Sequence, residues 1–244
     1  MPTFRHGRGT AILLDDEDVS IYFREAAINR TVDLAETSTY GTFDKTYVVG
    51  MRDATFTLEG LFDGSTDAID QQLATILGQE AEFAFTYAPE GLAFGRRVYV
   101  AAVDEVNYEV SSPLTDMVGT SAEFQASGGA FGGYSLHALT AETGDGNGTS
   151  IDNGASSAFG AIAALHLTAN DRDAGSISVR VQHSTDNSVW NDLITFASVN
   201  FAVTSGQVLS VAGTINRYLR AFWDVTGGTT GGYTFAVSAA RKTA

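Results

Sequence analysis

The residue types that most often do chemistry are present in this sequence, but they are not arranged for it. The four histidines, His6, His137, His166 and His183, have no metal-ligand spacing to one another or to nearby acids. We therefore interpret them as ordinary strand and loop residues. Because the chain has no cysteine, it has no thiol nucleophile, thiolate metal site or disulfide.

Two acidic segments are candidates for cation sites. The run Asp15-Asp16-Glu17-Asp18 could bind a cation, but neighbouring side chains on a turn splay apart, which favours a solvated turn. Residues 145–148, with Asp152 downstream, resemble a calcium loop only in part. They lack its spaced acids and terminal glutamate, which favours a flexible linker. No Gly-x-Ser-x-Gly elbow, phosphate-binding loop or dinucleotide fingerprint occurs. The sequence thus predicts no enzyme, no metal and no cofactor.

The composition is that of a globular chain rich in turns. Of 244 residues, 44% are hydrophobic and 18% charged, and 26 glycines stand against 3 prolines. No run approaches the roughly 20 apolar residues of a membrane span, and the N-terminus has no signal-peptide layout. We expect synthesis in a cytoplasm, and residence there unless the chain leaves within a larger assembly.

The net charge of −15 is unevenly distributed. Residues 1–140 hold 21 acids against 8 bases, whereas residues 141–244 hold 8 acids against 6 bases. Solubility alone would explain an acidic chain. An acidic first half also disfavours tight binding to a phosphate backbone.

Alternating apolar and polar residues predict short strands that each have one apolar and one polar face. Such strands, at this spacing, are typical of an antiparallel sandwich or barrel. In the first half these strands are expected at residues 10–14, 19–23, 31–36, 54–59, 81–87, 97–103, 105–110 and 121–126. One segment changes period, because Ile69, Leu73, Ile76 and Leu77 form a helical apolar stripe. We expect Ser65 or Thr66 to cap this helix, Asp67 and Asp70 to suit its N-terminus and Gly78 to end it.

Residues 36–51 stand out as a long segment without period that leads directly into a strand. A loop of this length is usually functional or disordered. On the residues alone, a mobile surface loop of a monomer is the favoured interpretation, and a contact loop is the alternative.

Residues 141–157 are rich in Gly, Asn, Ser and Thr and predict a linker. Beyond them, alternation at residues 177–182, 219–225 and 233–237 predicts a second small β-sandwich. The expected domains are therefore 1–140, the linker 141–157, and a C-terminal sandwich of Ig-like or discoidin-like type at 158–244.

The stretch from Gly9 to Asp63 resembles the N-terminal half of tail tube (major tail) proteins of long-tailed bacteriophages, or siphophages. The features that carry the resemblance are Asp-Val-Ser at 18–20, the Thr/Ser-Gly-rich segment, Tyr-Val-Val-Gly-Met-Arg-Asp-Ala-Thr at 47–55 and Leu-Glu-Gly-Leu-Phe-Asp at 58–63. The resemblance implies a barrel-forming fold of two packed sheets with one short helix. It also implies hexameric rings stacked into a hollow tube, through which DNA passes transiently without specific binding.

By the same resemblance, residues 36–51 occupy the place of the loop that reaches the next ring. The implied contact residues are Thr37, Tyr40, Phe43, Asp44, Lys45 and Tyr47. The implied partners are copies of the chain and the tape measure, tail terminator and distal tail proteins, and the implied location is the virion tail.

A second resemblance lies in the C-terminal half. Residues 178–193 and 216–225 are similar to discoidin-like and carbohydrate-binding sandwiches, in which a Ser-x-Asp turn and a Trp precede an Arg-Tyr strand. This implies a decoration domain, with Trp190 as a candidate contact for a host surface glycan. A structural role of Trp190 and Trp223 is the simpler reading. The alternative function is a carbohydrate-binding or adhesin module.

Overall fold

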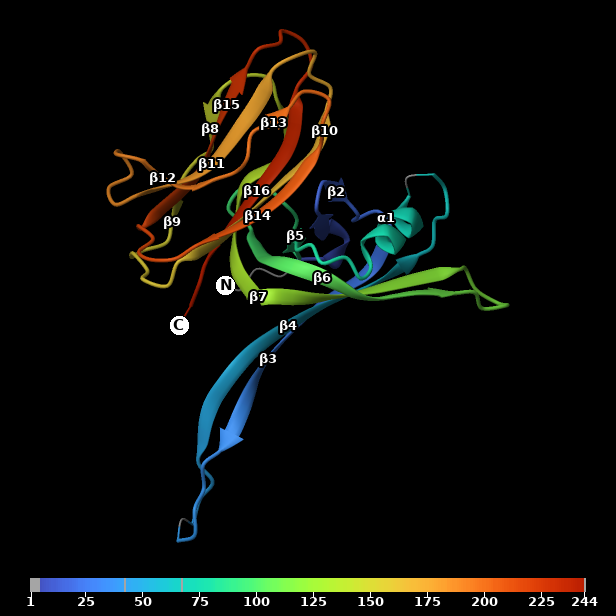
Figure 1. Ribbon diagram of the computed structural model, residues 1–244, viewed down its shortest axis with the longest axis vertical. Helices are drawn as coiled ribbons and strands as arrows, with labels where there is room; N and C mark the ends of the chain where they lie inside the picture. Colours follow the sequence, from blue (N-terminus) through green and yellow to red (C-terminus); the bar gives the residue numbers. More distant parts are fainter. Residues whose placement is uncertain (1–4, 42, 67, 244) are drawn as a thin grey trace. The chain divides into compact units, whose positions relative to one another are not determined.

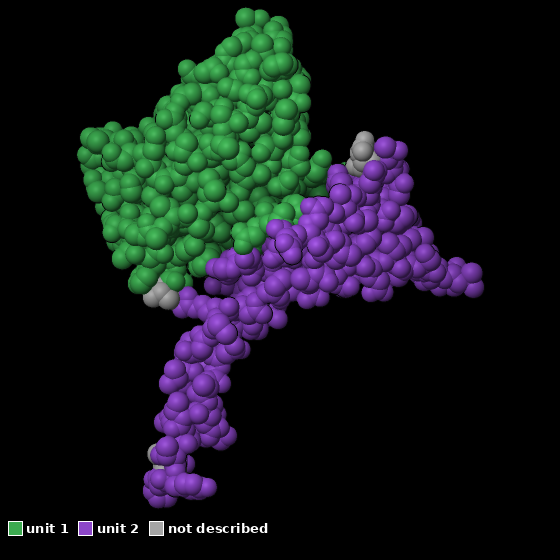
Figure 2. All heavy atoms as spheres, in the orientation of Figure 1, with its two compact units in different colours: residues 1–21, 81–102, 131–244 green, residues 22–80, 103–130 purple. Residues whose placement is uncertain are grey.

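A computed structural model describes residues 5–41, 43–66 and 68–243 (Figure 1). Within these residues, strands form two antiparallel sheets and a single short α-helix occurs, so the predicted mainly β fold class is confirmed. The chain divides into two compact units (Figure 2). Unit 1 comprises residues 1–21, 81–102 and 131–244, and unit 2 comprises residues 22–80 and 103–130.

The first sheet of unit 1 has the strand order β14-β10-β16-β7-β6-β5-β1-β2. Its strands are, in chain order, β1 (Ala11–Leu14), β2 (Glu17–Asp18), β5 (Phe83–Ala88), β6 (Arg97–Ser111), β7 (Gly119–Glu142), β10 (Ala161–Asn170), β14 (Ser205–Val211) and β16 (Tyr233–Arg241). A 3₁₀ turn, η1 (Gly7–Gly9), precedes β1. The strands β6 and β7 are long enough to continue into unit 2, because the units divide between residues 102 and 103 and between residues 130 and 131.

The second sheet of unit 1 packs on the first and completes a sandwich. Its strands are β8 (Gly146–Asn147), β9 (Ile151–Asp152), β11 (Ser176–Ser184), β12 (Asn191–Thr195), β13 (Val199–Asn200) and β15 (Tyr218–Thr226). Leu165 and Phe235 of the first sheet share one buried cluster with Val179 and Trp223 of the second. The Trp223 indole N–H donates to the Gly144 carbonyl at 3.0 Å, which satisfies its polar atom inside this core.

The division into units does not coincide with the boundaries expected at 140 and 158. Residues 141–157, expected to be a linker, contain β8 and β9, and both strands pair with β15. The sandwich also takes strands from both sides of that segment, since β16 pairs with β7 as well as with β10. The glycine- and serine-rich sequence here forms short edge strands. They contain too few apolar residues for an alternating pattern to predict them.

A buried histidine links three segments of unit 1. The His166 side chain on β10 is fully buried, its Nδ1 lies 2.7 Å from the Asp15 carbonyl oxygen, and its Nε2 lies 2.8 Å from the Thr86 hydroxyl. Because a carbonyl only accepts, Nδ1 carries the proton and Nε2 accepts from Thr86. Burial lowers the pKa of His166 to about 4, which keeps the ring neutral.

We expect Thr86→Val to lower the free energy of unfolding by about 1–3 kcal/mol, because it leaves a buried ring nitrogen without a donor. Thr86→Ser keeps the hydroxyl and is the matched control, expected to stay closer to the parent. Chemical denaturation at neutral pH measures both variants. Equal losses in the two variants would contradict the proposed hydrogen bond.

Unit 2 is built on a second set of strand pairs. Its strands β3 (Phe23–Glu36) and β4 (Tyr47–Leu61) form an antiparallel hairpin, and β4 pairs on its other side with β7. Phe56 and Leu58 of β4 and Phe124 of β7 are buried and lie on the same face of this sheet. Alternation in this part of β4 was visible in the sequence because one face is covered here.

The helix α1 (Ile69–Ile76) lies where the apolar stripe predicts it, and Ile69 and Leu73 are fully buried. Its N-terminal cap differs from the prediction: the cap residue is Ala68, and no side chain caps the helix. Gly78 follows the helix with a φ of +75°, a left-handed conformation that suits the predicted stop. The predicted contribution of Asp67 falls outside the described residues. Asp70 lies in the first turn as predicted, and it also accepts a hydrogen bond of 2.6 Å from the Tyr108 hydroxyl.

Unit 2 also buries an acid. Glu105 on β6 is 4% exposed, and neither carboxylate oxygen has a hydrogen-bond partner among the described residues. Removal from water disfavours the charged form and raises the pKa of Glu105 to about 8. The folded chain therefore keeps this proton over a pH range in which the unfolded chain has lost it.

This difference predicts a pH dependence of stability. The folded pKa lies above the ordinary value, so stability is fully present below the ordinary value of 4.5, falls as the pH rises towards 8 and then levels off. Glu105→Gln cannot ionise and should raise the free energy of unfolding by roughly 2–3 kcal/mol near pH 8, with little effect near pH 4. Denaturation across this range checks the prediction. An unchanged slope in the variant would show that Glu105 is not the titrating group.

Candidate functional site

The hairpin of β3 and β4 extends beyond the sheet that supports it. β4 pairs with β3 from Tyr47 to Gly60, but with β7 only from Thr55 to Leu61. The outer part of the hairpin is therefore a two-stranded ribbon, which protrudes from the rest of unit 2 (Figures 1 and 2). An isolated two-stranded ribbon is at best marginally stable in water.

Hydrogen bonds close the two strands at the base of the hairpin tip. The Thr37 amide donates to the Thr46 carbonyl at 2.8 Å, and the hydroxyls of Thr37 and Thr46 lie 3.0 Å apart. The Lys45 ammonium lies 3.0 Å from the Glu36 carboxylate in an exposed ion pair. Two of the predicted contact residues therefore make contacts across the hairpin: Thr37 contacts Thr46, and Lys45 contacts Glu36.

The tip presents two aromatic side chains to solvent. Tyr40 is 110% and Phe43 106% exposed, so neither ring packs on the chain itself. Asp44, next to Phe43, is also exposed. Exposed rings of this size are unusual on a monomer surface and typical of residues that anchor an interface.

The stem of the hairpin is apolar on both faces. Leu34 pairs with Val49 on one face, and Ala35 pairs with Val48 on the other. The exposed apolar side chains of the stem are Val32, Leu34, Tyr47, Val48, Val49 and Met51. A ribbon that carries apolar residues on both faces needs cover from both sides.

The expectation of a loop over residues 36–51 is wrong at both ends of that range. Glu36 is the last residue of β3, and residues 47–51 are the first of β4, so the connecting segment is residues 37–46. The outer part of β4 does not alternate, because its neighbouring apolar residues Val48 and Val49 lie on opposite faces and both are exposed. The predicted contact residue Tyr47 consequently lies on a strand, where it pairs with Glu36.

A second exposed apolar group, which the sequence analysis did not predict, lies where β6 ends and β7 begins. These strands are neighbours in the sheet, and their connecting segment protrudes from unit 2 (Figure 2). The exposed apolar residues are Val106 and Val110 at the end of β6 and Leu114, Met117 and Val118 in the connecting segment, with Leu114 102% exposed. Unit 2 therefore carries two protruding hairpins with uncovered apolar side chains.

The predicted glycan contact Trp190 lies in unit 1 and is half-buried. The Arg220 guanidinium sits 4.2 Å from the centre of its ring, and Arg220 is held in turn by Gln182 and Asn147. One face of the indole is thus occupied by a cation. This contact is consistent with a structural role for Trp190. A role of Trp190 in glycan binding stays a prediction.

The acidic segments do not converge on a cation site. Within the ranges that the structure covers, no three His, Asp or Glu side chains are placed to hold a metal ion together. The Asp145 carboxylate accepts from the Val225 amide at 2.7 Å, and Asp152 pairs with Arg217. No helix in the described part of the chain is long and apolar enough to cross a membrane.

No protein-family model matches the chain, and the curated proteins contain no significant match. Among solved structures, the virion of a native gene transfer agent particle has 14% identity and a TM-score of 0.43, over 52% of this chain and 97% of that chain. The tail of an empty gene transfer agent particle, with C6 symmetry, has 12% identity and a TM-score of 0.41 over the same shares. The SPP1 Dit protein, described as a hub adsorption apparatus of phages that infect Gram-positive bacteria, has 11% identity and a TM-score of 0.39 over 94% of this chain and 98% of that chain.

These structural neighbours are components of phage tails and of related particles. All three TM-scores lie below 0.5, so these similarities do not decide the function of this chain.

The double substitution Tyr40→Ser and Phe43→Ser should change the free energy of unfolding of the isolated chain by no more than about 0.5 kcal/mol, because neither ring is buried. Trp223→Ala, in the core of unit 1, is the contrasting variant and should lose about 3–5 kcal/mol. Thermal and chemical denaturation at low protein concentration measure both. A large loss in the tip variant would show that the rings pack on the chain.

Proposed function

We propose that the chain is a structural subunit of a long-tailed phage tail, which forms hexameric rings that stack into a tube. The observation that carries this proposal is the apolar stem of the β3–β4 hairpin with its exposed tip rings, Tyr40 and Phe43. Burial of such side chains in a neighbouring subunit contributes roughly 25 cal/mol per Å² of apolar surface. A subunit of a stacked tube has a neighbour along the axis to receive the hairpin.

An open sheet edge supports contacts within a ring. Over Phe23–Glu36, the strand β3 pairs with one strand among the described residues, β4. Edges of this length invite pairing with another chain, and closing a ring removes them. Head-to-tail contacts that close within a plane and repeat along the axis build a tube. We therefore assign the β3 edge to contacts within the ring and the hairpin tip to contacts between rings.

The charge of one sheet face fits a channel for DNA. On the face opposite Phe56, the paired strands of unit 2 carry the acids Glu25 and Asp53, together with Glu59 and Glu123. Of the three arginines of the hairpin, Arg30 and Arg52 lie on the same face as Phe56, and Arg24 lies at the register shift between Phe23 and Glu25. A carboxylate-lined wall repels the phosphate backbone, so DNA would pass without being held.

The proposal extends to the partners and the location implied by the sequence resemblance. The chain would act in the virion tail after synthesis in the host cytoplasm, and would meet tape measure, tail terminator and distal tail proteins. Its role would be structural and not enzymatic. DNA would pass transiently through the assembled tube.

Negative-stain microscopy of the concentrated protein tests the proposal. We expect hollow tubes or six-fold rings for the parent chain, and none when residues 38–45 are replaced by an Asn-Gly turn, which keeps the stem register but removes both rings. The control is Val189→Ser, which removes an exposed apolar side chain of unit 1. Monomeric parent protein at every concentration, or tubes that form equally well without the tip, would contradict the proposed assembly.

A further inference from the structure

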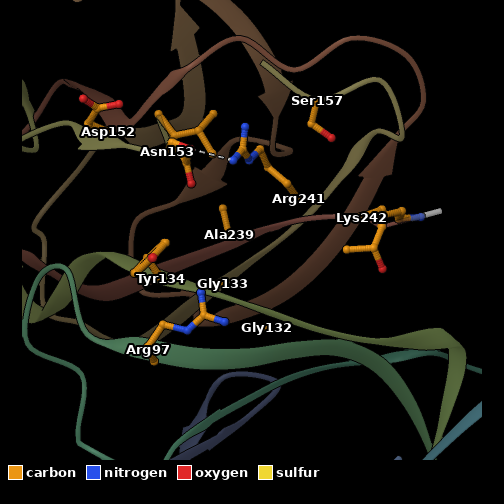
Figure 3. A pocket seen from close by; sticks show the side chains of 12 residues that line it. Arg97, Gly132, Gly133, Tyr134, Asp152, Asn153, Ser157, Ala239, Arg241 and Lys242 are labelled. Atoms are coloured by element: carbon orange, nitrogen blue, oxygen red, sulfur yellow. Dashed lines mark hydrogen bonds between the residues drawn. The ribbon is translucent and has the colours of Figure 1, made fainter. Parts of the chain in front are cut away.

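A cavity of about 290 Å³ in unit 1 has a lining unlike the rest of this acidic chain. Its walls come from β6, the middle of β7, the end of β16 and the segment that follows β9 (Figure 3). Three cationic side chains, Arg97, Arg241 and Lys242, contribute to it. The close-up places Arg241 and Arg97 on opposite walls with their guanidinium groups at the cavity (Figure 3).

The three cations have no carboxylate partner among the described residues. The one acid of the lining, Asp152, lies 2.6 Å from Arg217 through each carboxylate oxygen and is satisfied by that fork. This pairing and a backbone amide lower the pKa of Asp152 to about 2, so it stays ionised but is already neutralised by Arg217. The cavity therefore keeps an excess of positive charge in a chain of net charge −15.

Contacts that are not ion pairs hold the cations in place. The Arg97 guanidinium lies 4.9 Å from the centre of the Tyr134 ring, and the Lys242 ammonium lies 5.5 Å from that of Phe131. Arg241 donates to the carbonyls of Asn153, at 3.1 Å, and of Ala155. Side chains fixed by such contacts lose little further freedom when an anion binds.

Two glycines keep this cavity open. A Cβ at Gly132 would lie 2.9 Å from Nη2 of Arg97, and a Cβ at Gly133 would lie 2.0 Å from the Ala239 carbonyl oxygen. The first would press on the guanidinium, and the second would prevent β7 from approaching β16. At Gly132 and Gly133 the lining is thus backbone without a side chain.

The size and the remaining lining indicate what the cavity can hold. A water molecule occupies roughly 30 Å³ in the liquid, so a cavity of about 290 Å³ exceeds a bare phosphate several-fold. Its other groups are the Ser157 hydroxyl, the Asn153 amide and the Tyr134 ring. Hydroxyl and amide groups suit a polyol, and an aromatic face suits the apolar side of a sugar ring.

We propose that this cavity is a binding site for a small anionic sugar, a sugar phosphate or a sugar acid. Its phosphate or carboxylate would lie between Arg97 and Arg241 within reach of Lys242, and its hydroxyls would face Ser157 and Asn153. Guanidinium groups bind such anions by paired, charge-assisted hydrogen bonds. The site is independent of the β3–β4 hairpin and of the proposed assembly.

Isothermal titration of the full chain with glucose 6-phosphate, glucuronate, glucose and inorganic phosphate tests the proposal. We expect at least one of the two anionic sugars to bind with a dissociation constant on the order of 1 mM, and glucose and inorganic phosphate to bind at least about tenfold more weakly. Arg97→Gln should weaken the binding about tenfold, the usual effect of removing one charged hydrogen-bond donor. Arg8→Gln, the same charge change at an exposed position outside the cavity, should leave it unchanged.

Lys242→Gln provides a second variant in case Arg97→Gln alters the fold, and the melting temperature of each variant is measured first. Absence of binding for both anionic sugars would overturn the proposal. Binding of inorganic phosphate as tight as that of the sugars would overturn the assignment to a sugar. Binding that both folded cavity variants retain at full strength would place the ligand elsewhere on the chain.

Discussion

The unequal pairing of β4 on its two sides is the constraint on which the rest of unit 2 depends. Over Thr55–Leu61 this strand has a neighbour on each side, and its apolar face is buried. Beyond that segment, β7 is absent and the β3–β4 ribbon has only its own hydrogen bonds. Its valines, leucine and aromatic residues then face water on both sides. Exposed apolar surface of this kind favours association with another chain, which is the basis of the proposed assembly.

Unit 1 buries its apolar side chains between its own two sheets. Its two sheets share a continuous core, with the Trp223 N–H and the His166 ring nitrogens each given a partner. The same unit contains the cationic cavity, whose charges are left without carboxylates among the described residues. The two units therefore differ in what their described residues leave without a partner: apolar surface in unit 2 and positive charge in unit 1. Apolar surface without cover in unit 2 favours association, and positive charge without a counter-ion in unit 1 favours an anion.

The sequence predicts most clearly where one face of an element is buried. Phe56 and Leu58 of β4, the stripe of α1 and the alternation in β11 and β15 each reveal their elements for this reason. The outer part of β3 was predicted from the alternation at residues 31–36, but the outer part of β4 escapes detection because Val48 and Val49 face opposite sides and both are exposed. Local period likewise cannot report that β6 and β7 each continue from one unit into the other, or that β8 and β9 pair with a strand some seventy residues away.

The candidate site was predicted in part for the same reason. Tyr40, Phe43 and Tyr47 stand out as aromatic residues in polar sequence, which needs no knowledge of the fold. The β6–β7 tip with Leu114, and the meeting of Arg97 with Arg241, depend on sheet order and on strands far apart in the chain. No local pattern carries that information.

Hydrogen–deuterium exchange of the hairpin backbone in free and assembled protein tests the central claim most directly. The account predicts that residues 31–41 and 43–53 exchange readily in dilute protein and become protected in sedimented assemblies. The amides of β10 and β16, in the core of unit 1, should be protected in both states. Equal protection of the hairpin in the two states would contradict the claim that it is completed by a neighbouring subunit.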